Sequence, residues 1–78
     1  EEMEVMFAIY PNPAKDVINI NTNAVKYEYQ LINSLGQVVI GGTSNGAQQI
    51  NVSGINKGMY FLKVIADGEA RINKIVVE

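Results

Sequence analysis

Apolar side chains are most concentrated at the C-terminal end of the chain. Residues Gly58–Val77 contain two runs rich in β-branched and aromatic residues, which favour the pleated surface of a strand. Between the runs, Asp67 and Gly68 supply the two positive-φ positions that a tight hairpin turn requires. We therefore predict a C-terminal hairpin that forms the nucleus of the core. Both of its faces are largely apolar, so the pattern does not indicate which face points inward.

Five further segments have the composition or the alternation of strands. They are Val5–Tyr10, Asp16–Asn21, Lys26–Ile32, Gln37–Ile40 and a short run that holds Ile50 and Val52. The most regular is Lys26–Ile32, which places two tyrosines and Leu31 on a core-facing side and polar residues on the other. Together with the hairpin this makes seven short strands, and no segment has the period of an amphipathic helix. The spacing predicts an all-β fold, an antiparallel β-sandwich.

Proline, asparagine and glycine mark the connections between these strands. Pro11 and Pro13 each lack a backbone donor, and Pro13 holds Asn12 in an extended conformation, which together predict a rigid corner. Asn33 suits the first position of a type I turn. Gly36 suits the left-handed position of a bulged hairpin loop, so we predict a hairpin connection there.

Length and composition limit the chain to one small domain. With 78 residues, 47% of them apolar, it can bury a single core. It has no cysteine, so packing has to stabilise the fold without a disulfide. Because the sequence starts with Glu1 and Glu2 rather than methionine, we expect one domain of a longer protein. Residues 1–4 are then a linker remnant and residues 5–78 the folded domain.

Charge and hydropathy argue against several classes of partner. Six basic and eight acidic residues give a net charge of −2, and the basic residues are scattered along the chain. This distribution does not favour a nucleic-acid groove or a helix that lies on a membrane surface. No apolar run reaches the roughly 18 residues of a membrane span, and no basic segment precedes an apolar run as in a signal peptide.

The chain also lacks the residues of the common catalytic and metal sites. It has no histidine and no cysteine, so the usual zinc ligands, the usual general base and a thiol nucleophile are absent. No loop holds the cluster of acidic side chains that a calcium site needs. Segment 41–46 contains three glycines without the Gly-Lys-Ser/Thr of a phosphate-binding loop, so we predict a flexible loop there. We therefore expect no enzyme, no metal and no cofactor.

Four tyrosines permit a second interpretation, a platform on which sugars stack. They are Tyr10, Tyr27, Tyr29 and Tyr60. Three of them lie in register with core-facing neighbours, which favours packing over sugar binding. Because a sandwich fold hosts many functions, an accessory immunoglobulin-like or fibronectin-like module for adhesion or carbohydrate binding is kept as the alternative.

Four blocks of sequence together carry a family resemblance. The blocks are Tyr10–Pro13, Leu31–Val39, Ile55–Val64 and Lys74–Val77. In this order and at these separations they closely resemble the type A C-terminal sorting domain of the bacterial type IX secretion system. The resemblance extends from Phe7 to Val77. One position departs from the pattern, since the family commonly ends on a basic residue and this sequence has Glu78.

The resemblance implies an immunoglobulin-like β-sandwich without catalytic activity at the C-terminus of a larger exported protein. The outer-membrane translocon would read such a domain, and a sortase-like surface peptidase would usually remove it. The cargo would then stay at the cell surface or outside the cell. The implied partners are the translocon, the peptidase and an N-terminal cargo domain in the same chain, and no nucleic acid.

The open edges of a sandwich offer a means of recognition. Edge strands keep unpaired N–H and C=O groups that pair with a strand of a partner or of a second copy of the chain. We expect the final hairpin to offer such an edge, with Gly58 permitting close backbone approach and Tyr60 anchoring the strand in the core. The positioned charge and the apolar strip for the receptor are then Lys74, Ile75, Val76 and Val77.

Overall fold

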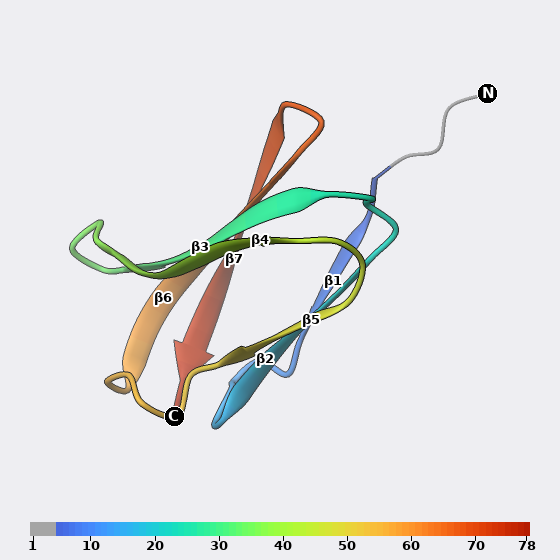
Figure 1. The fold of residues 1–78 in the computed structure, drawn as a ribbon. Coiled ribbons are helices and arrows are strands. Elements are labelled where there is room, and N and C mark those ends of the chain that lie inside the picture. Colours follow the sequence, from blue (N-terminus) through green and yellow to red (C-terminus); the bar gives the residue numbers. More distant parts are fainter. Residues whose placement is uncertain (1–4) are drawn as a thin grey trace.

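The computed structural model describes residues 5–78, which form seven β-strands and no helix (Figure 1). The strands are β1 (Phe7–Tyr10), β2 (Val17–Thr22), β3 (Tyr27–Asn33), β4 (Val38–Ser44), β5 (Gln48–Asn51), β6 (Gly58–Ala66) and β7 (Glu69–Val77). The predicted all-β fold of seven short strands is confirmed. The predicted linker remnant, residues 1–4, lies outside the described residues.

Two antiparallel sheets form a sandwich. One sheet has the strand order β1-β2-β5 and the other β4-β3-β6-β7, and every neighbouring pair is antiparallel. The chain changes sheet between β2 and β3, between β4 and β5 and between β5 and β6. Figure 1 shows the C-terminal hairpin, with β6 in orange and β7 in red, and β7 ends the strand order of its sheet. The predicted antiparallel β-sandwich is therefore confirmed.

The core lies between the sheets and receives alternate side chains from both. Ile18 and Ile20 are the buried residues of β2. On β3, Tyr27 and Leu31 are buried and Tyr29 between them is half-buried, as the alternation of this segment predicts. The largest fully buried side chains are Tyr27, Ile18, Ile20, Leu31, Leu62, Ile75, Val52 and Val64.

The structure settles which face of the C-terminal hairpin points inward. The buried residues of β6 and β7 are Tyr60, Leu62, Val64, Ala66, Ile75 and Val77. On the opposite face, Ile72 is 63% exposed and Met59 is 45% exposed. The inward face thus uses the even-numbered residues of β6 and the odd-numbered residues at the end of β7.

The two predicted hairpin turns have the expected backbone conformations. Asp67 and Gly68 have φ angles of 53° and 77°, so both central residues of the β6–β7 turn lie in the left-handed region. Gly36, in the β3–β4 turn, has a φ angle of 85°. The Gly36 N–H donates to the Asn33 carbonyl at 3.0 Å and the Asn33 N–H donates to the Gln37 carbonyl at 2.9 Å, which closes the predicted bulged loop. The pairing of β3 with β4 also shifts register between Leu31 and Ile32, an irregularity that the sequence did not predict.

The predicted loop at 41–46 is wrong for residues 41–44, because β4 continues through Gly41 and Gly42 to Ser44, and it is confirmed only for Asn45 and Gly46. Gly42 lies directly opposite Tyr29 in the antiparallel pair. A Cβ atom at Gly42 would stand 2.8 Å from the Tyr29 hydroxyl oxygen. The tyrosine side chain therefore occupies the room that glycine leaves, and cross-strand packing outweighs the weak strand propensity of glycine.

Candidate functional site

The C-terminal hairpin is the longest pair of strands in the described part of the chain. Its two strands have nine residues each, and their register runs from Gly58 opposite Val77 to Ala66 opposite Glu69. β6 lies between β3 and β7, so β7 has a neighbouring strand on one side only. The expected edge on the final hairpin is thus β7.

The six recognition candidates lie on opposite faces of this hairpin. Tyr60, Ile75 and Val77 point into the core, with exposed fractions of 6%, 1% and 3%. The Tyr60 hydroxyl donates a hydrogen bond of 2.5 Å to the Asn56 carbonyl. Val76 is half-buried and Lys74 is exposed, and both lie on the outer face of the sheet. Only the outward pair is therefore available to a partner as side chains.

Gly58 begins β6 at the open end of the hairpin. Its φ angle of 146° is one that side chains rarely adopt, which accounts for glycine at this position. Apart from its two neighbours in the chain, no described residue has an atom within 4 Å of a Cβ atom placed there. Close approach of a partner's backbone to Gly58 stays a prediction.

Asn12 joins the Pro11–Pro13 corner to the edge of β7. Its Nδ2 group donates a hydrogen bond of 2.8 Å to the Lys74 carbonyl, and its Oδ1 atom accepts one of 3.1 Å from the Val76 N–H. The side-chain amide thus pairs with β7 as a peptide group of a neighbouring strand would. Both X–Pro peptide bonds of the corner are cis.

Ala14 extends this pairing by two backbone hydrogen bonds. Its N–H donates to the Val76 carbonyl at 2.7 Å, and its carbonyl accepts from the Glu78 N–H at 2.7 Å. The pair Ala14 and Val77 forms a parallel bridge, and Ala14 is fully buried. We call Asn12–Ala14 the clasp, because it covers the last third of the β7 edge. Sequence analysis predicted the corner but missed this contact, whose only sequence signal is an asparagine between two prolines.

The backbone groups of the rest of the β7 edge point away from the sheet. In an antiparallel pair, alternate residues direct their N–H and C=O groups to the partner strand and away from it. The clasp binds backbone groups of Val76 and Glu78. The even-numbered residues of β7 therefore direct their N–H and C=O groups away from β6, toward the open edge. Ala70 and Ile72 therefore also present N–H and C=O groups at the edge, beyond the reach of the clasp.

The turn motifs lie at opposite ends of the sheet. Asn33 is opposite Tyr60 in the β3–β6 pair, near the open end of the hairpin. Its Oδ1 atom accepts hydrogen bonds of 3.0 Å from the Leu35 N–H and 2.9 Å from the Gln37 N–H. Asp67 closes the hairpin at the other end. Asn33 and Gly36 thus shape the turn beside Tyr60, while Asp67 and Gly68 shape the turn at the other end of the hairpin, away from the recognition candidates.

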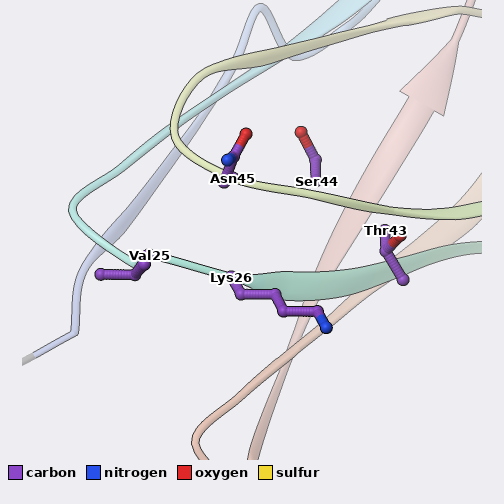
Figure 2. Close-up of a pocket in the computed structure, with 5 residues that line it drawn as sticks. All are labelled: Val25, Lys26, Thr43, Ser44 and Asn45. Atoms are coloured by element: carbon purple, nitrogen blue, oxygen red, sulfur yellow. The ribbon is translucent and has the colours of Figure 1, made fainter.

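An open hollow of about 390 Å³ lies between the start of β3 and the end of β4 (Figure 2). Its lining residues are Val25, Lys26, Thr43, Ser44 and Asn45. Figure 2 shows Lys26 extending along β3, while Ser44 and Asn45 point away from it. No carboxylate lines the hollow, and residues 5–78 contain no group of three or more potential metal-ligating side chains. Lys26 is the one charged side chain among the lining residues of this hollow.

The tyrosines do not form an exposed platform. Tyr27 and Tyr60 are buried and Tyr29 is half-buried, as predicted from their register with core-facing neighbours. Tyr10 is 50% exposed and is the one aromatic residue among the exposed large apolar side chains of the described chain. Residues 5–78 therefore present no surface on which a sugar could stack against several tyrosines.

A comparison with known families decides between the remaining interpretations. The model described as "Secretion system C-terminal sorting domain" matches residues 8–78. The chain belongs to this family. A sorting domain of this family is a non-catalytic signal of type IX secretion, as the four sequence blocks predict. The match covers β1 from its second residue, all of β2 to β7, and the clasp. A search of curated proteins finds no match. Among residues 5–78, no helix has the length and apolarity to cross a membrane.

Proposed function

We propose that this sorting domain directs a larger cargo protein through the outer membrane by the type IX secretion system. The match over residues 8–78 supports the assignment of the signal. In the proposal the cargo lies N-terminal to the domain in the same chain, and it ends at the cell surface or outside the cell. The direct partners are the outer-membrane translocon, which reads the domain, and a sortase-like surface peptidase, which removes it.

The end of β7 is the part of the domain that the translocon contacts in this proposal. Lys74 and Val76 present a positive charge and an apolar surface on the outer face. Ile75 and Val77 hold the strand in place through their buried side chains. The single observation that supports these two roles is that neighbouring residues at the end of β7 point to opposite faces of the sheet, Lys74 and Val76 outward and Ile75 and Val77 inward.

The test replaces the outward pair and spares the inward one. Deleting the buried side chains of Ile75 and Val77 would cost several kcal/mol and unfold a small domain. A reporter fused to the Lys74→Ser/Val76→Ser variant keeps this packing. We expect its export to fall by roughly tenfold, which corresponds to about 1.4 kcal/mol of lost binding free energy. Export is measured as the reporter fraction outside the cell.

The chain offers a matched control for this variant. Val25 and Lys26 are an exposed valine and lysine at another end of the molecule, and Val25 is 86% exposed. The Val25→Ser/Lys26→Ser variant loses the same two side chains, so its export should equal that of the unchanged domain. Equal export of both double variants would contradict the proposed role of Lys74 and Val76.

A further inference from the structure

The four edge strands of the sandwich differ in how they are protected against pairing. In the described chain the edges are β1, β5, β4 and β7. Very short strands and bulges are two ways in which proteins blunt an edge. β1 and β5 have four residues each, and the β3–β4 pair contains a register shift. β7 has nine residues and pairs with β6 without a shift, so it is the long and regular edge.

The clasp protects only the C-terminal part of this edge. It occupies the Lys74 carbonyl, both backbone groups of Val76 and the Glu78 N–H. The outward N–H and C=O groups of Ala70 and Ile72 and the Lys74 N–H lie beyond it. A strand added at this place would meet five backbone groups in a row without displacing any strand or loop of residues 5–78.

We propose that an extended segment of the translocon pairs with β7 over Ala70–Lys74 and ends where the clasp begins. This inference rests on the proposed function and specifies the part of the domain that is read. In this inference the partner pairs with the backbone of β7 near the β6–β7 turn, and not with the backbone of Ile75–Val77. Lys74 and Val76 then contribute side chains on the outer face, while the clasp fixes the register of the partner by ending the free edge.

The outer face beside this segment indicates the chemistry of the partner. Ile72 is 63% exposed and lies opposite Lys63, while Lys74 lies two residues further along the same strand. A partner strand that places an apolar side chain against Ile72 and a carboxylate beside the lysines complements this face. Glu28 is an acidic residue on the same face, but it lies on β3, two strands away from the β7 edge, so the charge beside the edge is that of the lysines.

Charge disfavours a second copy of the chain as the occupant. Antiparallel pairing of two β7 strands about Ile72 would bring Lys63 and Lys74 of both copies to one face. Lysine at an edge is itself a device against self-pairing, because like charges at close range repel. The partner is therefore an acidic and apolar extended segment of another protein.

The decisive variant is Ile72→Pro. It removes an outward N–H group and leaves the hydrogen bonds between β7 and β6 in place, since proline is tolerated where the N–H of an edge strand faces solvent. Ile72→Thr is the matched control, because threonine is β-branched, favours strands and keeps the N–H group. Both variants lose the apolar contact of the Ile72 side chain, and only proline also loses the N–H group. With both domains folded by circular dichroism, we expect reporter export by Ile72→Pro to be at least roughly tenfold lower than export by Ile72→Thr.

A charge reversal tests the chemistry of the partner separately. Lys63→Glu places a negative charge beside Ile72 and should lower export. Lys26→Glu makes the same change in net charge at an exposed position just before β3, two strands away from the β7 edge, and should leave export unchanged. Equal export of the two variants would overturn the assignment of an acidic partner.

The remaining outcomes also decide the question. Export of Ile72→Pro at the level of Ile72→Thr overturns strand addition, even where Lys74→Ser/Val76→Ser is still defective. An unchanged domain that does not export the reporter overturns the proposed function itself. A dimer of the unchanged 78-residue chain in sedimentation, lost in Ile72→Pro, would show that a second copy occupies the edge and would overturn the partner named here.

Discussion

A single asparagine side chain can take the place of a peptide group at the edge of a sheet. The amide of Asn12 donates to one carbonyl of β7 and accepts from one N–H, as an added strand would. Its neighbours Pro11 and Pro13 have no backbone N–H to contribute. The partners of Asn12 lie 62 and 64 residues away along the chain, so local sequence patterns carry no information about this contact.

We predict that Asn12→Ala destabilises the domain by about 1–3 kcal/mol. The substitution removes two hydrogen bonds, each of which contributes about 0.5–1.5 kcal/mol. Urea unfolding followed by circular dichroism measures the change. The exposed Asn45 is the control, and Asn45→Ala should change the free energy of unfolding by no more than about 0.5 kcal/mol. Equal values for the two variants would mean that the Asn12 amide adds nothing to stability.

Among the elements, β4 shows where a propensity argument fails. Two adjacent glycines are poor strand residues, yet both pair regularly with β3. Gly42 is opposite Tyr29, and the tyrosine ring covers the place of a side chain. Gly41 is opposite Gln30 and has no such neighbour, since its nearest Cβ contact would be at 3.5 Å. Packing across the pair, rather than the residue type alone, therefore sets the length of β4.

The two glycines should respond differently to alanine. In Gly42→Ala the new Cβ atom would be 2.8 Å from the Tyr29 hydroxyl, so the ring has to move. We expect a loss of about 1 kcal/mol or more in the free energy of unfolding. Gly41→Ala should be neutral or stabilise by up to about 1 kcal/mol, because alanine loses less backbone entropy than glycine. Thermal unfolding of the two variants measures this difference in stability. A Gly42→Ala variant that is more stable than the unchanged domain would contradict the packing argument.

Local signals predicted the elements well because their causes lie within a few residues. The turn at Asp67 and Gly68 follows from two residues that tolerate positive φ, and the alternation around Tyr27 follows from the two-residue period of a strand. The clasp and the full length of β4 depend on contacts between distant segments. The inward face of the hairpin is also a tertiary property, because both of its faces carry apolar side chains and only packing into the common core distinguishes them.

At the scale of the whole molecule, one core joins the two sheets. Buried side chains come from strands of both sheets and from Ala14, Ala24 and Val52 between strands. The chain has no cysteine, so no disulfide adds to this packing. A single small core of this kind unfolds as one cooperative unit. A change at its centre therefore alters the stability of the whole domain.

Tyr27 makes the domain sensitive to alkali. Burial raises the pKa of its phenol above the ordinary value of 10.0, although a hydrogen bond with Ser44 acts in the opposite direction. The folded state thus holds the proton to a higher pH than the unfolded chain does. This contribution is fully present below pH about 10 and is lost as the pH rises through the folded pKa, because the unfolded state is then favoured by ionisation.

We predict that Tyr27→Phe weakens the dependence of stability on pH above about pH 10. Below this range the variant should be less stable by about 0.5–1.5 kcal/mol, since it loses the hydrogen bond from the hydroxyl to the Gly46 carbonyl. Urea unfolding at a series of pH values gives both effects. Tyr10→Phe, at a 50% exposed position, is the control. An alkaline slope that is the same in Tyr27→Phe and Tyr10→Phe would exclude Tyr27 as its source.

The order in which a ribosome makes the chain gives the contact of Asn12 a further consequence. Asn12 is synthesised 62 residues before Lys74, so its amide cannot form this hydrogen bond until the final strand has been made. A polypeptide truncated before β7 could not form the hydrogen bonds of Asn12 with Lys74 and Val76, even if the β1-β2-β5 sheet had formed. The contact of Asn12 with β7 therefore forms only in a domain whose translation reached the last strand, a useful property in a C-terminal sorting domain.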